Sequence, residues 1–163
     1  MYLPQEQALW LLLPALPFGL WIAWTDLKFM RITNRAVLSL TACFLVLAPF
    51  VMPFDVYLWR LLQVVVVLAV GFVMNAFGLI GGGDAKYAAA MAGFFDLADS
   101  RFIVLLFAAM VVGAYATHRI AMRIGFVRAL TPDWKSWTAG KDFPMGLALS
   151  GTLILYLLLA LAY

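Results

Sequence analysis

The stretch YLWRLLQVVVVLAVGFVMNAFGL (residues 57–79) holds a single charged side chain, that of Arg60. A helix rises ~1.5 Å per residue, so about 20 apolar residues in a row cross the ~30 Å hydrocarbon core of a bilayer. The stretch therefore predicts a transmembrane helix. Five more apolar stretches flank it, at residues 7–24, 36–53, 84–98, 102–118 and 144–163. We expect an all-α, polytopic membrane helix bundle of about six transmembrane helices that forms a single domain over residues 1–163.

The composition also indicates a membrane protein. Hydrophobic residues make up 66% of the chain and charged residues 12%, whereas soluble domains average about 45–50% and about 25%. The only cysteine, Cys43, lies inside an apolar stretch and is expected to pack as a small apolar side chain. Residues 1–8 contain Glu6 but no Lys or Arg, so the basic region of a signal peptide is missing and residues 7–24 are expected to be a retained span.

Two segments differ from the other stretches. The fourth, at 84–98, is short and rich in alanine, and small residues let helices approach closely in lipid. We therefore expect it in the middle of the bundle. The segment 119–143 instead alternates Lys and Arg with Trp and Phe. It predicts an interfacial loop or an amphipathic helix on the membrane surface, either a gate or an anchor.

Lys and Arg are distributed unevenly between the connections. If the N-terminus lies outside, nine of the eleven basic residues fall in cytosolic connections, and only Arg60 and Arg101 lie on the outer side. Orientation follows Lys and Arg, so this asymmetry predicts an outside N-terminus. We expect the basic face to contact anionic lipid and not nucleic acid. The nine residues are Lys28, Arg31, Arg35, Lys86, Arg119, Arg123, Arg128, Lys135 and Lys141.

Two acids then stand at the cytosolic ends of spans. Asp26 follows the first span, and Asp84 comes directly after three successive glycines. Each acid alone can be an ordinary interfacial charge, but an ionisable group at a membrane boundary is also a functional candidate. Gly costs about 1 kcal/mol relative to Ala in a helix. The glycine run therefore indicates that the backbone closely approaches another helix, a substrate or a catalytic partner.

If the first and fourth spans are neighbours, the carboxyls of Asp26 and Asp84 can meet. Two like charges a few ångströms apart do not both ionise easily, so the pKa of one carboxyl rises and the pair shares a proton. Such a pair can hydrolyse a peptide bond, because one carboxylate activates water while the other protonates the carbonyl or the leaving amine. Asp26 and Asp84 are the predicted catalytic residues, and Asp133 or Asp142 could replace Asp26 if the helices packed differently.

Three motifs resemble those of the type IV prepilin peptidases, a family of GxGD aspartyl proteases. One is similar to the GxGD signature, one to the first-aspartate motif and one to the Pro-x-Gly-x-Ala opening of the last span. They are Gly81-Gly82-Gly83-Asp84-Ala85-Lys86, Asp26-Leu27-Lys28-Phe29-Met30-Arg31-Ile32-Thr33-Asn34 and Phe143-Pro144-Met145-Gly146-Leu147-Ala148.

The resemblance implies that a prepilin loses its basic leader at the cytosolic surface of the bacterial inner membrane. Cleavage would follow a glycine and precede the hydrophobic helix, with Asp26 and Asp84 as the catalytic pair and with neither metal nor cofactor. Bifunctional members carry an N-terminal insertion with paired cysteines, for which this chain has neither room nor cysteines. It looks instead like the short leader peptidase of tight-adherence (Flp-type) pilus systems, with a prepilin and membrane lipids as partners.

Two positions depart from the family pattern. Thr33 stands where the family usually has Pro, and Met145 replaces an aromatic residue often found there. Asn34 is interpreted as the N-cap of the second span, with a substrate contact as the alternative. Lys86 is interpreted as a topology or salt-bridge residue. Its alternative role is to attract an acidic side chain of the substrate or to tune the acid pair.

The remaining polar residues are expected to be structural. His118, the only histidine, has no second ligand nearby, so a metal role is not expected. Asp133 and Asp142 are interpreted as surface loop acids. Asp96 and Asp99 are expected on the outer face, too far from Asp84 to act with it.

Two other functions stay open at this point. A GxGD protease of the presenilin or signal-peptide-peptidase kind would show a Tyr-Asp motif and a Pro-Ala-Leu motif in the last span. This chain has Thr25-Asp26, and Pro14-Ala15-Leu16 lies in the first span. A small transporter or pilus-assembly subunit would use Asp26 and Asp84 as proton-relay acids.

Overall fold

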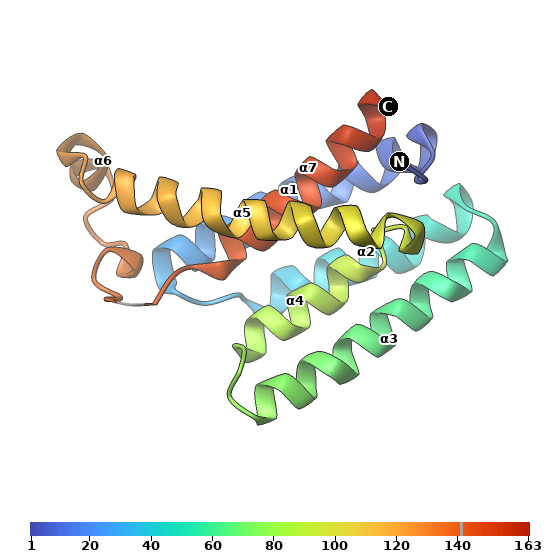
Figure 1. The fold of residues 1–163 in the computed structure, drawn as a ribbon, viewed down its shortest axis with the longest axis horizontal. Helices are drawn as coiled ribbons and strands as arrows, with labels where there is room; N and C mark the ends of the chain where they lie inside the picture. Colours follow the sequence, from blue (N-terminus) through green and yellow to red (C-terminus); the bar gives the residue numbers. More distant parts are fainter. Residues whose placement is uncertain (141) are drawn as a thin grey trace.

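The computed structural model describes residues 1–140 and 142–163, and that part of the chain is helical without a strand (Figure 1). Lys141, one of the nine basic residues counted above, lies outside the described residues. The elements in order are α1 (Gln5–Phe29), α2 (Asn34–Val51), α3 (Phe54–Ala76), α4 (Gly82–Ala92), the 3-10 helix η1 (Leu97–Asp99), α5 (Ser100–Ala121), α6 (Gly125–Leu130), the 3-10 helix η2 (Lys135–Trp137) and α7 (Met145–Ala162).

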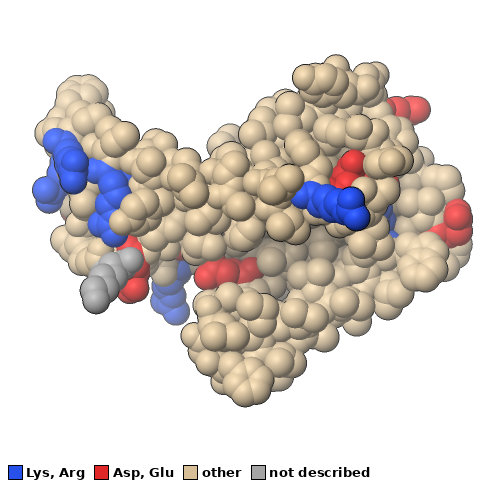
Figure 2. All heavy atoms as spheres, viewed as in Figure 1, with Lys and Arg blue, Asp and Glu red and all other residues tan. Residues whose placement is uncertain are grey.

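Five helical segments are long and apolar enough to cross a membrane, namely α1, α2, α3, α5 together with η1, and α7. Their outward faces are apolar: within α3 only Arg60 and Gly71 are buried, while Trp59 and Phe72 are exposed. Figure 2 shows a broad uncharged surface over α3 and the middle of α5, with basic side chains gathered around α6. Such a surface suits lipid and not water, and the predicted polytopic helix bundle is confirmed.

The fourth predicted span contains a shorter helix than expected. The stretch 84–98 was predicted as one span, but α4 ends at Ala92. Its 11 residues rise only about 16 Å, roughly half of a bilayer core. The chain bends at Gly93, where a Cβ would lie 2.8 Å from the Phe44 ring. Beyond the bend, the Asp96 N–H donates to the Tyr156 hydroxyl (3.0 Å), so the non-helical backbone is satisfied inside the protein.

The segment from Asp84 to Asp99 nevertheless connects opposite ends of the bundle. Asp84 lies near the end of α1 that carries Asp26, since both line one cavity. Asp99 lies near the start of α1, where its carboxylate accepts the Tyr2 N–H at 3.1 and 3.2 Å. At this second end, Arg60 pairs with Asp96 (2.7 Å). Asp96 and Asp99 are therefore far from Asp84, as predicted.

As expected from its small residues, α4 packs among three helices: α2, α3 and α7. The closest approach is to α3, where a Cβ on Gly71 would lie 3.0 Å from the Ala85 Cβ. Tyr87 is fully buried, and its hydroxyl shares a hydrogen bond with Ser150 of α7 (3.0 Å). On its far side α7 packs extensively along α1. Both α4 and α1 pack against α7. The start of α4 and the end of α1, which are predicted to face the cytosol, are therefore held beside each other.

Candidate active site

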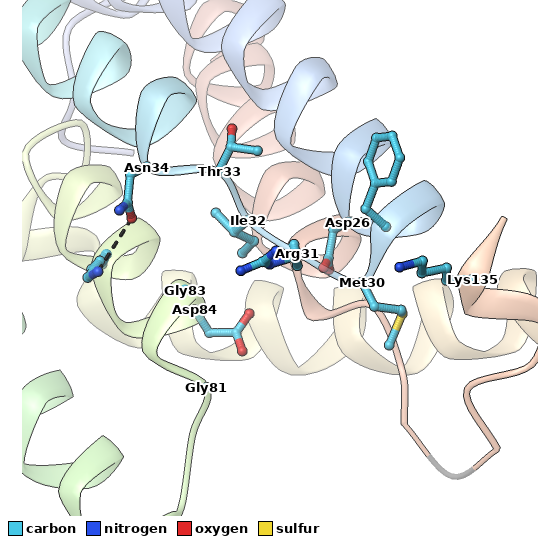
Figure 3. Close-up of a pocket in the computed structure, with 12 residues that line it drawn as sticks. Asp26, Met30, Arg31, Ile32, Thr33, Asn34, Gly81, Gly83, Asp84 and Lys135 are labelled. Atoms are coloured by element: carbon cyan, nitrogen blue, oxygen red, sulfur yellow. Dashed lines mark hydrogen bonds between the residues drawn. The ribbon is translucent and has the colours of Figure 1, made fainter.

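A polar cavity of about 690 Å³ lies at the end of the bundle where α1 finishes and α4 begins (Figure 3). Its walls are the last turn of α1, the connection 30–33, the glycine run and η2. The lining residues are Asp26, Phe29, Met30, Arg31, Ile32, Thr33, Asn34, Gly81, Gly83, Asp84, Lys86 and Lys135. The cavity therefore brings together both predicted acids and most of the predicted supporting residues.

Asp26 is held by the opening of the last helix. Its side chain is buried, and its Oδ2 accepts the Gly146 N–H at 2.7 Å. Gly146 lies in the first turn of α7, where free N–H groups and the helix dipole favour a carboxylate. A Cβ on Gly146 would lie 2.9 Å from Oδ2 and 3.0 Å from the Asp26 Cβ. A glycine is thus needed for this contact, which gives the third motif a physical role beside the first acid.

Asp84 stands in the first turn of α4, outside the five membrane-spanning segments, and is half-buried. Burial raises the pKa of its carboxyl above the ordinary value, and a hydrogen bond from the Gly81 backbone acts in the opposite direction. A Cβ on Gly81 would lie 2.5 Å from the Asp84 Oδ2. A glycine at position 81 therefore leaves room for the Asp84 carboxyl to fold back over the backbone.

The other two glycines of the run differ in how tightly they are packed. A Cβ on Gly83 would lie 3.2 Å from the Ile32 Cβ, so α4 closely approaches the connection that follows α1. A Cβ on Gly82 would meet only the Asn75 side chain, at an ordinary 3.6 Å. The close contacts of the glycine run are therefore with the Asp84 carboxyl at position 81 and with the connection after α1 at position 83.

The connection after α1 is shaped by Met30. This residue closes α1 in the left-handed region, at a φ of 52°, and its N–H donates to the Asp26 carbonyl (2.8 Å). A residue with a side chain rarely adopts this conformation, and such residues are found more often at functional sites. The turn leads into Arg31 and Ile32, which line the cavity, and in the view of Figure 3 Arg31 lies between the two acids.

Asp26 and Asp84 face one space from separate helices. Figure 3 shows the Asp84 side chain pointing from α4 toward the part of the cavity where Asp26 descends from α1. Within residues 1–140 and 142–163, no group of three His, Cys, Asp or Glu side chains is arranged to hold a metal ion. The arrangement offers two carboxyls and the space between them for a peptide and a water molecule.

The predicted roles of Asn34 and Lys86 need correction. Asn34 is the first residue of α2, and the N-cap is Thr33, whose side chain makes no capping hydrogen bond. The N-cap interpretation of Asn34 is therefore wrong, because the helix begins one residue too early for it. The Asn34 Oδ1 instead accepts a long hydrogen bond from the Lys86 Nζ (3.4 Å). Lys86 forms no ion pair with any residue that the structure describes, so the salt-bridge interpretation also fails.

Lys135 is a cavity residue that sequence reasoning did not single out. It belongs to η2, which packs on α1. Trp137 anchors this turn: its ring stacks on His118 (centroids 5.1 Å apart), and its indole N–H donates to the Thr131 carbonyl (2.8 Å). The clustered Trp and Lys of segment 119–143 were the available signal, but they suggested a membrane surface. Part of that segment, η2, packs on α1 at this end of the bundle.

The remaining acids and the histidine lie away from the cavity. Asp133 and Asp142 are exposed and do not line it. His118 is buried in the aromatic cluster, with its ring 6.0 Å from that of Phe143. The structure thus places Asp26 and Asp84, and neither loop acid, in the cavity.

Comparison with known proteins gives one match. A sequence model of the type IV leader peptidase family matches residues 10–117, a range that contains both cavity acids and ends before η2 and α7. No curated protein and no solved structure matches the chain.

Proposed function

We propose, since the chain belongs to the type IV leader peptidase family, that it is an aspartic endopeptidase in which Asp26 and Asp84 form the catalytic pair. The observation that carries this proposal is the shared cavity: two carboxyls from separate helices face one polar space at the end of a membrane bundle. The substrate in this family is a prepilin in general. As a finer proposal, the substrate is a Flp-type prepilin. This is supported by the single cysteine in these 163 residues, since the bifunctional members of the family carry paired cysteines.

The chemistry follows from one proton shared by two carboxyls. The ionised carboxylate takes a proton from water, whose oxygen attacks the carbonyl carbon of the scissile peptide, and the protonated carboxyl gives its proton to the carbonyl oxygen. When the tetrahedral intermediate collapses, the C–N bond breaks and the amine takes the proton that the first carboxylate received from water. A hydroxyl of the intermediate returns its proton to the second carboxylate, so the pair again holds one proton. Arg31, Lys86 and Lys135 line the same space, where a positive charge stabilises the negative charge that develops on the carbonyl oxygen.

We further propose that the cavity faces the cytosol of a bacterial inner membrane. This end carries Lys28 in the last turn of α1, Arg31 in the connection to α2, Arg35 in the first turn of α2 and Lys86 in α4. It also carries Arg119 in the last turn of α5 and, between α5 and α7, Arg123, Arg128 and Lys135. The opposite end carries Arg60 and Arg101, of which Arg60 is paired with Asp96. Retention of Lys and Arg on the cytosolic side supports this orientation.

The first prediction concerns the two acids. Asp26→Asn and Asp84→Asn should each lower prepilin cleavage by about 10²-fold or more, because an amide can neither accept nor donate the shared proton. The measurement is cleavage of a membrane-inserted prepilin whose basic leader ends in glycine, followed on a gel and by N-terminal sequencing. Asp133→Asn and Asp142→Asn are matched controls, since both acids are exposed near the same end without lining the cavity.

Full cleavage by either cavity variant would remove that acid from the mechanism. A wild-type protein that cleaved no prepilin but carried ions across vesicle membranes would instead support the proton-relay alternative. The midpoint of thermal unfolding in detergent should be the same for all four variants and the wild type. A loss of activity then cannot be attributed to unfolding.

A further inference from the structure

A second cavity, of about 290 Å³, opens between α4, α5 and α7 and meets the polar cavity at Asp84. We call it the apolar groove. It exists because α5 packs on α7 and η1, whereas α4 packs on α2, α3 and α7. The small side chain of Ala88 on α4 and the exposed Val104 on α5 both line this space.

The groove differs from the polar cavity in chemistry. Apart from Asp84, its only polar lining side chain is Thr152, and that hydroxyl donates to the Ala148 carbonyl at 2.8 Å. The hydroxyl is thus already satisfied, so the groove offers its occupant a hydrocarbon wall of residues such as Met91, Phe107 and Leu149. The charged residues Arg31, Lys86 and Lys135 line the polar cavity and not the groove. Asp84 is therefore the point at which the polarity of the surroundings changes.

A prepilin changes polarity in the same sense at its cleavage site, because a basic leader ends and a hydrophobic helix begins there. We propose that the apolar groove binds the apolar side chains that directly follow the scissile bond, while the leader side lies in the polar cavity; this inference rests on the proposed function. Ligand pockets are commonly about 300–1,000 Å³. The groove therefore has room for a few side chains on one face of the substrate and not for a whole helix.

Met145, the first residue of α7, lies in the wall of the groove. It lines the groove at the position where the family resemblance leads one to expect an aromatic residue. An unbranched, flexible side chain adapts to different neighbours more readily than a ring does. Met145 therefore gives the groove a flexible wall on the α7 side.

A matched pair of valines on α5 tests the groove. Val104 and Val112 are both exposed, at 66% and 69%, but only Val104 lines the groove. Val104→Trp should fill it and lower cleavage of the membrane-inserted prepilin by about tenfold or more. Val112→Trp should cleave at the wild-type rate, because its indole would meet lipid.

Disulfide crosslinking gives a second readout that does not depend on activity. Cys43 is the only cysteine, so a Cys43→Ser background allows single new cysteines. With Asp26→Asn to trap the substrate, copper–phenanthroline oxidation should join Val104→Cys to a prepilin that carries a cysteine just after the scissile bond. Val112→Cys should give a much lower yield.

The outcomes separate this inference from the proposed function. If the wild type cleaves prepilin but Val104→Trp and Val112→Trp cleave equally well, or both cysteines crosslink equally, the groove holds lipid and the inference is overturned. If the wild type cleaves no prepilin, the proposed function itself fails and the groove inference fails with it.

Discussion

At the scale of single residues, the acid of one helix is positioned by the backbone of another. Asp26 lies in the last turn of α1, and the Gly146 N–H that binds it lies in the first turn of α7, 120 residues away along the chain. The motif around Gly146 could be read from the sequence as the opening of a span. Its contact with Asp26 could not, because nothing in the local sequence says which helix ends meet.

The residue-scale prediction is that Gly146→Ala inactivates the enzyme. The new Cβ would lie 2.9 Å from the Asp26 Oδ2, so the carboxyl must shift, and small displacements of reacting groups cost about 10²-fold in rate. The measurement is the rate of prepilin cleavage, with the stability of the fold checked by thermal unfolding.

Gly113→Ala is the matched control for this change. Gly113 lies within α5, and a Cβ there would meet nothing within 4 Å. Alanine also favours a helix over glycine by about 1 kcal/mol, so this variant should keep full activity. Wild-type cleavage by Gly146→Ala would show that Asp26 does not depend on the opening of α7.

At the scale of elements, the apolar stretches predicted the long helices, but they did not predict where α4 ends. The composition of 84–98 continues to favour a membrane segment beyond Ala92. The bend is decided by contacts with three other helices. Gly93 packs against the Phe44 ring of α2, and Asp96 binds Arg60 of α3 and Tyr156 of α7. Such tertiary contacts are not visible in the composition of the stretch itself.

The element-scale prediction concerns η2. Trp137→Ala removes the ring that stacks on His118 and the indole hydrogen bond to Thr131. The turn should then detach from the end of the bundle, so that trypsin cuts after Lys135 faster and prepilin cleavage falls by about tenfold. Trp59→Ala, on the exposed face of α3, is the control and should change neither readout. Unchanged protease sensitivity in Trp137→Ala would mean that other contacts hold η2.

At the scale of the whole molecule, the bundle has one closed end and one hollow end. At the closed end, Tyr156 donates to Asp99 (2.9 Å), and Arg60 pairs with Asp96 (2.7 Å), so four side chains join α3, α7 and the segment between α4 and α5. At the hollow end, the polar cavity contains both predicted acids. The distribution of Lys and Arg predicted which residues share an end. It could not predict that η2 would form part of the cavity wall.

The central claim is that Asp26 and Asp84 act as one unit across this cavity. The most direct test is the rate of prepilin cleavage by Asp26→Asn, Asp84→Asn and the double variant under identical conditions. Groups that act together lose their effect together, so each single variant should be as slow as the double variant. A double variant whose loss equals the product of two smaller, independent losses would show that the two acids do not share one catalytic step.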